Sequence, residues 1–206
     1  MRDAFSILSR RRLLLLAGTA LRMEASEPPF WNSKPPGEWS TGDIYQLVNH
    51  SPWANPVQGW RPGFADPFRP PRTGPPPAPQ EFGPKGVVTW ESARPIRDAL
   101  KTQLPGVFSN LYVIGVDGFP TGGSLRNNLR RATVLRSNAK PKWSVNAVVV
   151  RELIRNSAVY AFGFPKAAAR IAADSGEVVF QTQFGPWTVH TKFKPKEMLY
   201  HGDLAL

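Results

Sequence analysis

The amino-acid sequence predicts an α+β protein with a small mixed sheet, a C-terminal antiparallel hairpin, two or three short helices and a Pro- and Trp-rich N-terminal arm. After Lys85, short apolar segments of strand period alternate with segments of helical period. Two strand-like runs over 177–184 and 187–193 flank Gly185-Pro186, a pattern typical of a hairpin. The alternation indicates a folded domain, and the sequence contains no internal repeat.

Residues 1–25 have the organisation of a signal peptide. Three consecutive arginines, beginning at Arg10, precede an apolar run over 13–21, and small residues follow near a cleavage point. This run is too short for a membrane span, which needs about 20 residues. We expect cleavage after Ala20 or Ala25, which would leave a periplasmic or secreted protein without a transmembrane anchor. The alternatives are a buried N-terminal helix and a mitochondrial presequence.

The export route stays open between two pathways. The run SRRRLL over 9–14 resembles the twin-arginine signal, which exports proteins that are already folded. Leu15 stands where that signal often has a lysine, so the Sec route is an equal alternative.

The chain is strongly basic, with 26 basic and 15 acidic residues and a net charge of +11. Five of the basic and two of the acidic residues lie in the leader, so 21 basic and 13 acidic residues remain, a net charge of +8. For an exported protein this charge favours an acidic envelope polymer or a lipid surface as the partner, whereas export would separate the protein from nucleic acid. The alternative is that the charge serves solubility alone. Because there is no cysteine, disulfides and zinc–thiolate sites are excluded.

In the N-terminal arm, residues 26–60, one short helix is expected over 40–50. Ser40 or Thr41 can cap its N-terminus, and Asp43 in the first turn favours the positive end of the helix dipole. A proline two residues beyond the helix stops it.

A Pro-rich segment over 61–86 separates the arm from an α+β domain over 87–206. The segment holds nine prolines and shows neither a helix nor a strand period. This composition predicts a linker or surface loop.

Within 87–206 the periodicity predicts short strands and helices. Besides the hairpin, we expect strands over 87–91, 110–116, 145–153 and 158–164, helices over 93–102 and 122–135, and a further edge strand within 198–206. The order strand, helix, strand at the start of the domain is typical of a βαβ unit, and an antiparallel pairing of the same two strands is the open alternative.

Two carboxylates are the candidates for catalysis. Glu91 and Asp117 each stand at the end of a predicted strand, so the domain can bring them near each other, as glycoside hydrolysis requires. The alternative is that Glu91 pairs with Arg94 or Arg97 as a structural ion pair.

Other catalytic and cofactor signatures are absent from the sequence. None of the three histidines stands at ligand spacing from another histidine or an acid, so no metal and no cofactor are expected. His50 ends the arm helix, and His190 falls on the polar face of a strand, where we expect it to be solvated. The nucleophile elbow and the phosphate-binding glycine motifs do not occur.

Aromatic and basic residues supply the candidates for ligand binding. Exposed indoles could stack on sugar rings, the candidates being Trp31, Trp39 and Trp60. The alternative is that these rings pack the arm onto the domain, and we expect Trp53 and Trp90 to be buried at that junction. Arginines on the helix over 122–135 and just beyond it could bind nucleic acid, the candidates being Arg126, Arg130, Arg131 and Arg136.

Three motifs together resemble an uncharacterised family of exported proteins from soil bacteria of the acidobacterial type. These motifs are Ser51-Pro52-Trp53 after the arm helix, Trp90-Glu91-Ser92-Ala93 at a strand end, and Met198-Leu199-Tyr200-His201-Gly202 near the C-terminus. The resemblance covers most of the mature chain and implies organisation and location, without a mechanism. The chain departs from the family in its longer Pro-rich insert before Gly86.

The sequence therefore favours a non-catalytic binding or structural protein of the cell envelope. A periplasmic hydrolase that uses carboxylates is the alternative, and a basic nucleic-acid-binding protein is the second alternative.

Export can be tested on the mature N-terminus. In fractionated cells we expect the protein outside the cytoplasm, with a mass that begins near residue 21 or 26, because the leader would be removed. Retention of Met1 on a cytoplasmic protein would contradict the signal peptide, and loss of export in cells without the twin-arginine pathway would select that route.

Overall fold

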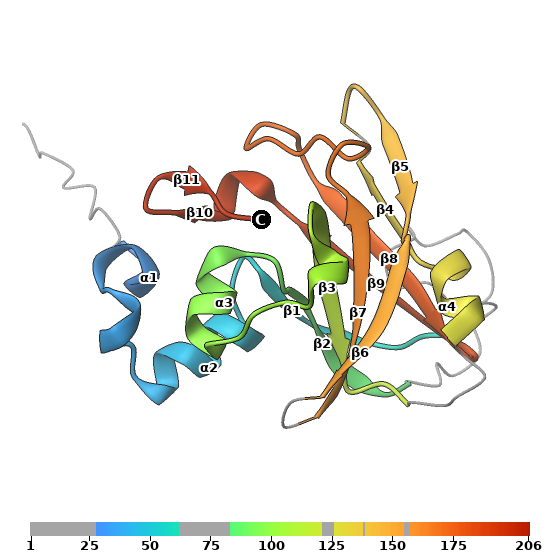
Figure 1. The fold of residues 1–206 in the computed structure, drawn as a ribbon, viewed down its shortest axis with the longest axis horizontal. Helices are drawn as coiled ribbons and strands as arrows, with labels where there is room; N and C mark the ends of the chain where they lie inside the picture. The colour runs from blue at the N-terminus through green and yellow to red at the C-terminus, as the bar shows by residue number, and fades with distance from the viewer. Residues whose placement is uncertain (1–27, 62–82, 121–125, 138, 155–156) are drawn as a thin grey trace, which may run out of the picture.

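The computed structural model describes residues 28–61, 83–120, 126–137, 139–154 and 157–206, and it confirms the α+β class (Figure 1). The predicted signal peptide and most of the Pro-rich segment lie outside these residues. Where a mixed sheet was expected, neighbouring strands in the described part of the chain are antiparallel throughout. This includes the pair formed by the first two strands of the domain, so the antiparallel alternative is correct and the βαβ unit is wrong.

One sheet has five strands and includes a strand from the N-terminal arm. In spatial order its strands are β1 (Ala54–Gln58), β2 (Lys85–Trp90), β3 (Leu111–Asp117), β7 (Ala158–Pro165) and β6 (Val149–Ile154). Because β1 pairs with β2 across the Pro-rich segment, the arm is built into the same sheet as the domain.

The second sheet has four strands and contains the predicted hairpin. Its strands in spatial order are β5 (Trp143–Asn146), β4 (Val134–Ser137), β8 (Val178–Phe184) and β9 (Trp187–Phe193). Phe184 lies opposite Trp187 across the Gly185-Pro186 turn, which confirms the hairpin and its register.

The two sheets are joined along both sides. On one side, Trp60 and Thr188 exchange backbone hydrogen bonds of 3.0 and 2.7 Å between the end of β1 and β9. On the other side, the chain leaves β5 and enters β6 through two residues. There Ala147 N–H donates to the carbonyl of Thr133, just before β4 of the second sheet, and Val148 N–H to that of Gly163 on β7 of the first. The result is a sandwich whose two sheets meet at both edges.

Aromatic side chains fill the space between the sheets. The ring of Phe162 on β7 lies 5.8 Å from that of Phe180 on β8, and Trp90 on β2 lies 5.1 Å from Phe193 on β9. All four side chains are fully buried. Contacts of this kind between opposed inner faces are the main source of stability in a sandwich.

Helices α1, α2 and α3 gather beside β1–β3, whereas α4 lies on the opposite side of the molecule (Figure 1). Their bounds are α1 (Phe30–Ser33), α2 (Thr41–Asn49), α3 (Arg94–Leu100) and α4 (Arg126–Ala132). Short 3-10 turns occur at η1 (Pro36–Glu38), η2 (Gly106–Phe108) and η4 (Pro195–Glu197). None of the helices in the described residues is long and apolar enough to cross a membrane.

A capping box fixes the start of α2, with Ser40, one of the two predicted caps, as the N-cap. The Ser40 hydroxyl accepts from the Asp43 N–H at 3.1 Å, and the Asp43 carboxylate accepts from the Ser40 N–H at 2.9 Å. That second bond holds the pKa of Asp43 below its ordinary value. His50 follows as the C-cap, in the position expected for it.

Trp53 joins the arm to the rest of the core. Its side chain is fully buried, and its indole N–H donates to the Ala205 carbonyl at 2.7 Å. The Trp53 carbonyl accepts from the Trp90 N–H, and its ring lies 5.6 Å from that of Trp31. The predicted burial of Trp53 and Trp90 is therefore confirmed.

Two predicted elements in the middle of the chain are wrong in extent. The helix expected over 122–135 ends at Ala132, because the buried Thr133 hydroxyl bonds to the Leu129 carbonyl and to Thr182, and Leu135 belongs to β4. The single strand expected over 145–153 is two strands in different sheets, since the chain crosses between the sheets after Asn146.

The expected edge strand within 198–206 is also different in the structure. Two short strands, β10 (Leu199–Tyr200) and β11 (Asp203–Leu204), pair with each other and form a separate small hairpin. This hairpin covers the helices α1 and α3 (Figure 1) and carries Ala205 to Trp53.

We expect Trp53→Ala to lower the free energy of unfolding by about 3–5 kcal/mol, the range for truncation of a well-packed aromatic side chain. Denaturant unfolding measures the change. Tyr45→Ala is the matched control, because this ring is 62 % exposed on α2 and its loss should matter by less than about 0.5 kcal/mol. Equal midpoints for the wild type and Trp53→Ala would contradict the role of Trp53.

Candidate functional site

The structure brings the two predicted carboxylates to one pocket on the outer face of the five-stranded sheet. Glu91 and Asp117 line a cavity of about 220 Å³ together with Thr89, Gly115 and Ser157. A Cβ placed on Gly115 would lie 2.6 Å from Glu91 Oε1, so the Glu91 carboxylate lies directly over this glycine. Gly115 precedes Asp117 by two residues on the same face of β3, a step of roughly 7 Å along a strand.

The environment of these carboxylates favours a structural role over catalysis. Glu91 is only 2 % exposed, so a polymer could not reach its carboxylate without displacing the surrounding residues. Asp117 accepts hydrogen bonds of 2.6 Å from the Ser157 hydroxyl and from the Gly118 N–H. Arg94, one of the two arginines predicted as partners of Glu91, pairs with Asp98 at 3.8 Å.

Two of the three candidate tryptophans are buried. Trp31 is 8 % and Trp39 7 % exposed, and both belong to the main core. They cannot offer a ring face to a sugar, so the alternative in which they pack the arm onto the domain is correct. Trp60 is half-buried, with its backbone paired to Thr188.

The candidate arginines do not form one surface along a helix. Arg130 and Arg131 are exposed on α4, and the Arg126 side chain lies outside the described part of the chain. Arg136 is on β4 instead, half-buried, with its guanidinium 3.5 Å from the Gln181 amide oxygen. His190 is half-buried as well, in contrast to the predicted solvated position.

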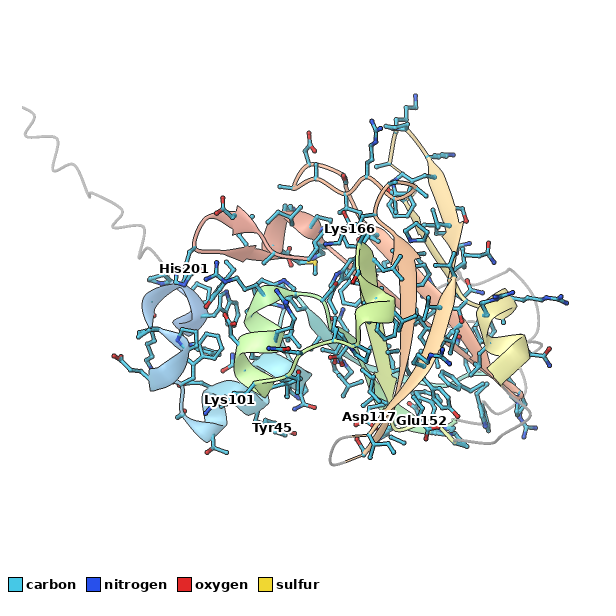
Figure 2. All side chains as sticks on the ribbon, viewed as in Figure 1. Tyr45, Lys101, Asp117, Glu152, Lys166 and His201 are labelled. Atoms are coloured by element: carbon cyan, nitrogen blue, oxygen red, sulfur yellow. The ribbon has the colours of Figure 1, made fainter. Side chains whose placement is uncertain are left out.

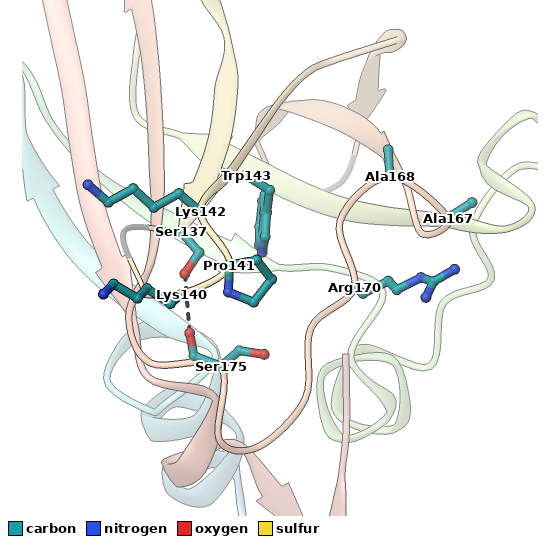
Figure 3. A pocket seen from close by; sticks show the side chains of 9 residues that line it. All are labelled: Ser137, Lys140, Pro141, Lys142, Trp143, Ala167, Ala168, Arg170 and Ser175. Carbon is teal, nitrogen blue, oxygen red and sulfur yellow. Dashed lines mark hydrogen bonds between the residues drawn. The ribbon is translucent and has the colours of Figure 1, made fainter.

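A second pocket is formed by residues that the sequence reading did not single out. It lies at one end of the sandwich, between the loop that joins β4 to β5 and the loop that joins β7 to β8 (Figure 3). Its volume is about 240 Å³, and it is lined by Ser137, Lys140, Pro141, Lys142, Trp143, Ala167, Ala168, Arg170 and Ser175. Figure 2 shows Lys166, on the second of these loops, and Asp117 toward opposite ends of the strands of the five-stranded sheet.

Backbone and hydroxyl groups hold the two loops of this pocket together. The Ser137 hydroxyl donates to the Ser175 carbonyl at 3.2 Å and accepts from the Ala139 N–H at 3.2 Å (Figure 3). Gly176 has a φ of +70°, and a Cβ there would lie 2.8 Å from the Ala139 side chain. Both the positive φ and the short distance to Ala139 therefore favour glycine at position 176.

The β7–β8 loop is also anchored to the core. Ala169 is fully buried, and the Lys166 N–H donates to the Asn110 carbonyl at 3.2 Å. The Lys166 ammonium lies 5.1 Å from the centre of the Tyr112 ring, and burial raises the pKa of the Tyr112 hydroxyl. These contacts fix the shape of the loop over 166–177, which has no helix or strand of its own.

The pocket is cationic on its rim. Lys140, Lys142 and Arg170 are exposed, and none of them forms an ion pair within the described residues. Its described lining contains no carboxylate. Trp143 occupies an inward-facing position of β5 at the mouth of the sandwich, half-buried against the core. A ring beside three unpaired cations can bind an anion that has an apolar face.

The signal for this pocket in the sequence is the run Lys140-Pro141-Lys142-Trp143. This run places two cations and an indole within four consecutive residues. The third cation of the pocket, Arg170, is distant in sequence, so periodicity along the chain does not indicate that it joins this run.

Within the described residues, no group of three or more histidine or acidic side chains could hold a metal ion. No protein-family model, curated protein or solved structure matches the chain.

Gly115→Ala tests how tightly Glu91 is packed. The added methyl would also lie 2.8 Å from Glu91 Cγ and 2.9 Å from Val159 Cγ1, so we expect a loss of about 1–3 kcal/mol in unfolding free energy. Gly106→Ala is the control, because a Cβ there meets no atom within 4 Å. Equal stability of the two variants would show that the Glu91 side chain can move aside.

Proposed function

We propose that this protein is an exported, non-catalytic binding protein of the cell envelope, and that its Trp143 pocket binds an anionic polymer. The observation that carries the proposal is the set of three unpaired cations around one pocket without a carboxylate in its described lining. The signal-peptide pattern and the resemblance to exported proteins support the location.

The charge of the chain supports a binding role at this end of the molecule. Two other exposed cations, on β9 and just after it, are neutralised, since Lys192 pairs with Glu177 at 2.9 Å and Lys194 with Glu197 at 3.2 Å. The cations around Trp143 are not neutralised in this way, so the field there is available to an anion.

Carboxylate-dependent hydrolysis is the second candidate, because Glu91 and Asp117 share a pocket. Its weakness is the burial of Glu91. A polymer could reach the Trp143 pocket without displacing buried residues.

Charge reversal tests the binding proposal. In the triple variant Lys140→Glu, Lys142→Glu and Arg170→Glu, affinity for immobilised polygalacturonate should fall by at least about 100-fold, since each cation beside an anionic surface contributes about 1 kcal/mol. The matched control, Arg130→Glu, Arg131→Glu and Arg151→Glu, changes the net charge equally at exposed positions elsewhere. Equal weakening in both triples would show that net charge alone is responsible.

The absence of catalysis is tested on the same polymer. We expect no release of reducing ends by the wild type or by Glu91→Gln, because the Glu91 carboxylate is buried and out of reach of a polymer chain. Release by the wild type that disappears in both Glu91→Gln and Asp117→Asn would instead establish the hydrolase.

A further inference from the structure

The Trp143 pocket combines an indole, small apolar residues and a charged rim. Trp143 lines it from β5, and Ala167 and Ala168 belong to the lining contributed by the β7–β8 loop. Figure 3 shows the indole edge-on, with Lys140 and Lys142 extending on one side of it and Arg170 on the other. A flat ligand beside Trp143 would thus meet the indole on one face and cations at its edges.

The volume of the pocket limits what can enter. At about 240 Å³ it is smaller than the 300–1,000 Å³ typical of sites for drug-sized ligands. One ring with its substituents is the unit that such a space accommodates, and the rest of a polymer would run outward over the rim.

The combination of groups narrows the class of anion. A chain of phosphates has the charge but no ring face for the indole. A neutral sugar has the face but no charge for Arg170, whose planar guanidinium matches a carboxylate through two parallel hydrogen bonds. A pyranose ring that carries a carboxylate provides both.

Single-stranded nucleic acid also combines rings with anionic groups. Proteins that follow such strands stack successive bases on successive aromatic side chains. In the described lining of this pocket Trp143 is the one aromatic residue, so the pocket provides a single platform. That arrangement suits one sugar ring better than a stack of bases.

We infer that the Trp143 pocket binds a uronic acid residue of an acidic polysaccharide, with the sugar ring on the indole and its carboxylate toward Arg170. This inference rests on the proposed function, whose polymer it specifies. The loop contacts through Ser137, Ser175 and Gly176 keep the slot open in the absence of ligand.

The experiment compares four soluble probes by calorimetry: oligogalacturonate, its methyl ester, inorganic polyphosphate and oligothymidylate. The ester keeps the sugar ring and loses the charge, polyphosphate keeps the charge without a ring, and oligothymidylate combines bases with phosphate. The variants are Trp143→Phe and Trp143→Leu, which both keep an apolar side chain against the core but differ in the flat face. Thermal unfolding confirms that both are folded.

We expect the wild type to bind oligogalacturonate more tightly than the other three probes. Trp143→Leu should weaken this binding at least about fivefold, as loss of a stacking platform does at other ring-binding sites. Trp143→Phe should retain most of it, and polyphosphate binding should be the same in all three proteins.

Three results would overturn the inference, and they separate it from the proposed function. Unchanged oligogalacturonate binding in Trp143→Leu, with polyphosphate binding still lost in the triple charge variant, would refute the sugar slot alone. Tighter, Trp143-dependent binding of oligothymidylate would assign the platform to bases. Anion binding that survives the triple charge variant would refute both proposals.

Discussion

The hydrogen bond between the Trp53 indole and the Ala205 carbonyl is the contact on which the arrangement of the helices depends. It joins groups 152 residues apart in the sequence and lies inside the core. Around it pack α1 through Trp31, β2 through the Trp90 N–H, and the small β10–β11 hairpin that carries Ala205. Because a buried indole N–H without a partner is costly, the arm, the sheet and the C-terminal hairpin have to be in place together.

This arrangement leaves the two ends of the sandwich with different characters. The helices, the arm and the C-terminal hairpin occupy one flank, and α4 stands at the start of β4 with Leu129 inserted into the core. At the far end of β4 two loops form the Trp143 pocket, and no helix of the described residues covers it. The pocket of Glu91 and Asp117 lies on an outer sheet face instead, so the molecule separates its acidic pocket from its cationic one.

Local patterns predicted the elements whose signals are contained in a few neighbouring residues. The helix cap at Ser40, the Gly185-Pro186 hairpin and the burial of Trp53 and Trp90 belong to this group. The boundary at Thr133 and the division of 145–153 were missed because they depend on Thr182 and Gly163, partners far along the chain. The Trp143 pocket was missed for the same reason, since 137–143 and 167–175 meet only in three dimensions. Glu91 and Asp117 do share a pocket, although β2 and β3 do not form the expected βαβ unit. Their antiparallel pairing places Asp117 opposite Val87, at the other end of β2 from Glu91.

The joining of the two sheets along both sides has a consequence for how the protein behaves at high concentration. An open sheet edge presents unpaired N–H and C=O groups that can recruit a strand from another molecule and start aggregation. Here the Trp60–Thr188 bridge and the crossing at Ala147-Val148 turn the outermost strands toward each other. The charged residues Arg151 and Glu152 in the middle of β6 further discourage a neighbouring strand from adding to it. The fold is thus protected against edge-to-edge association by its own connectivity.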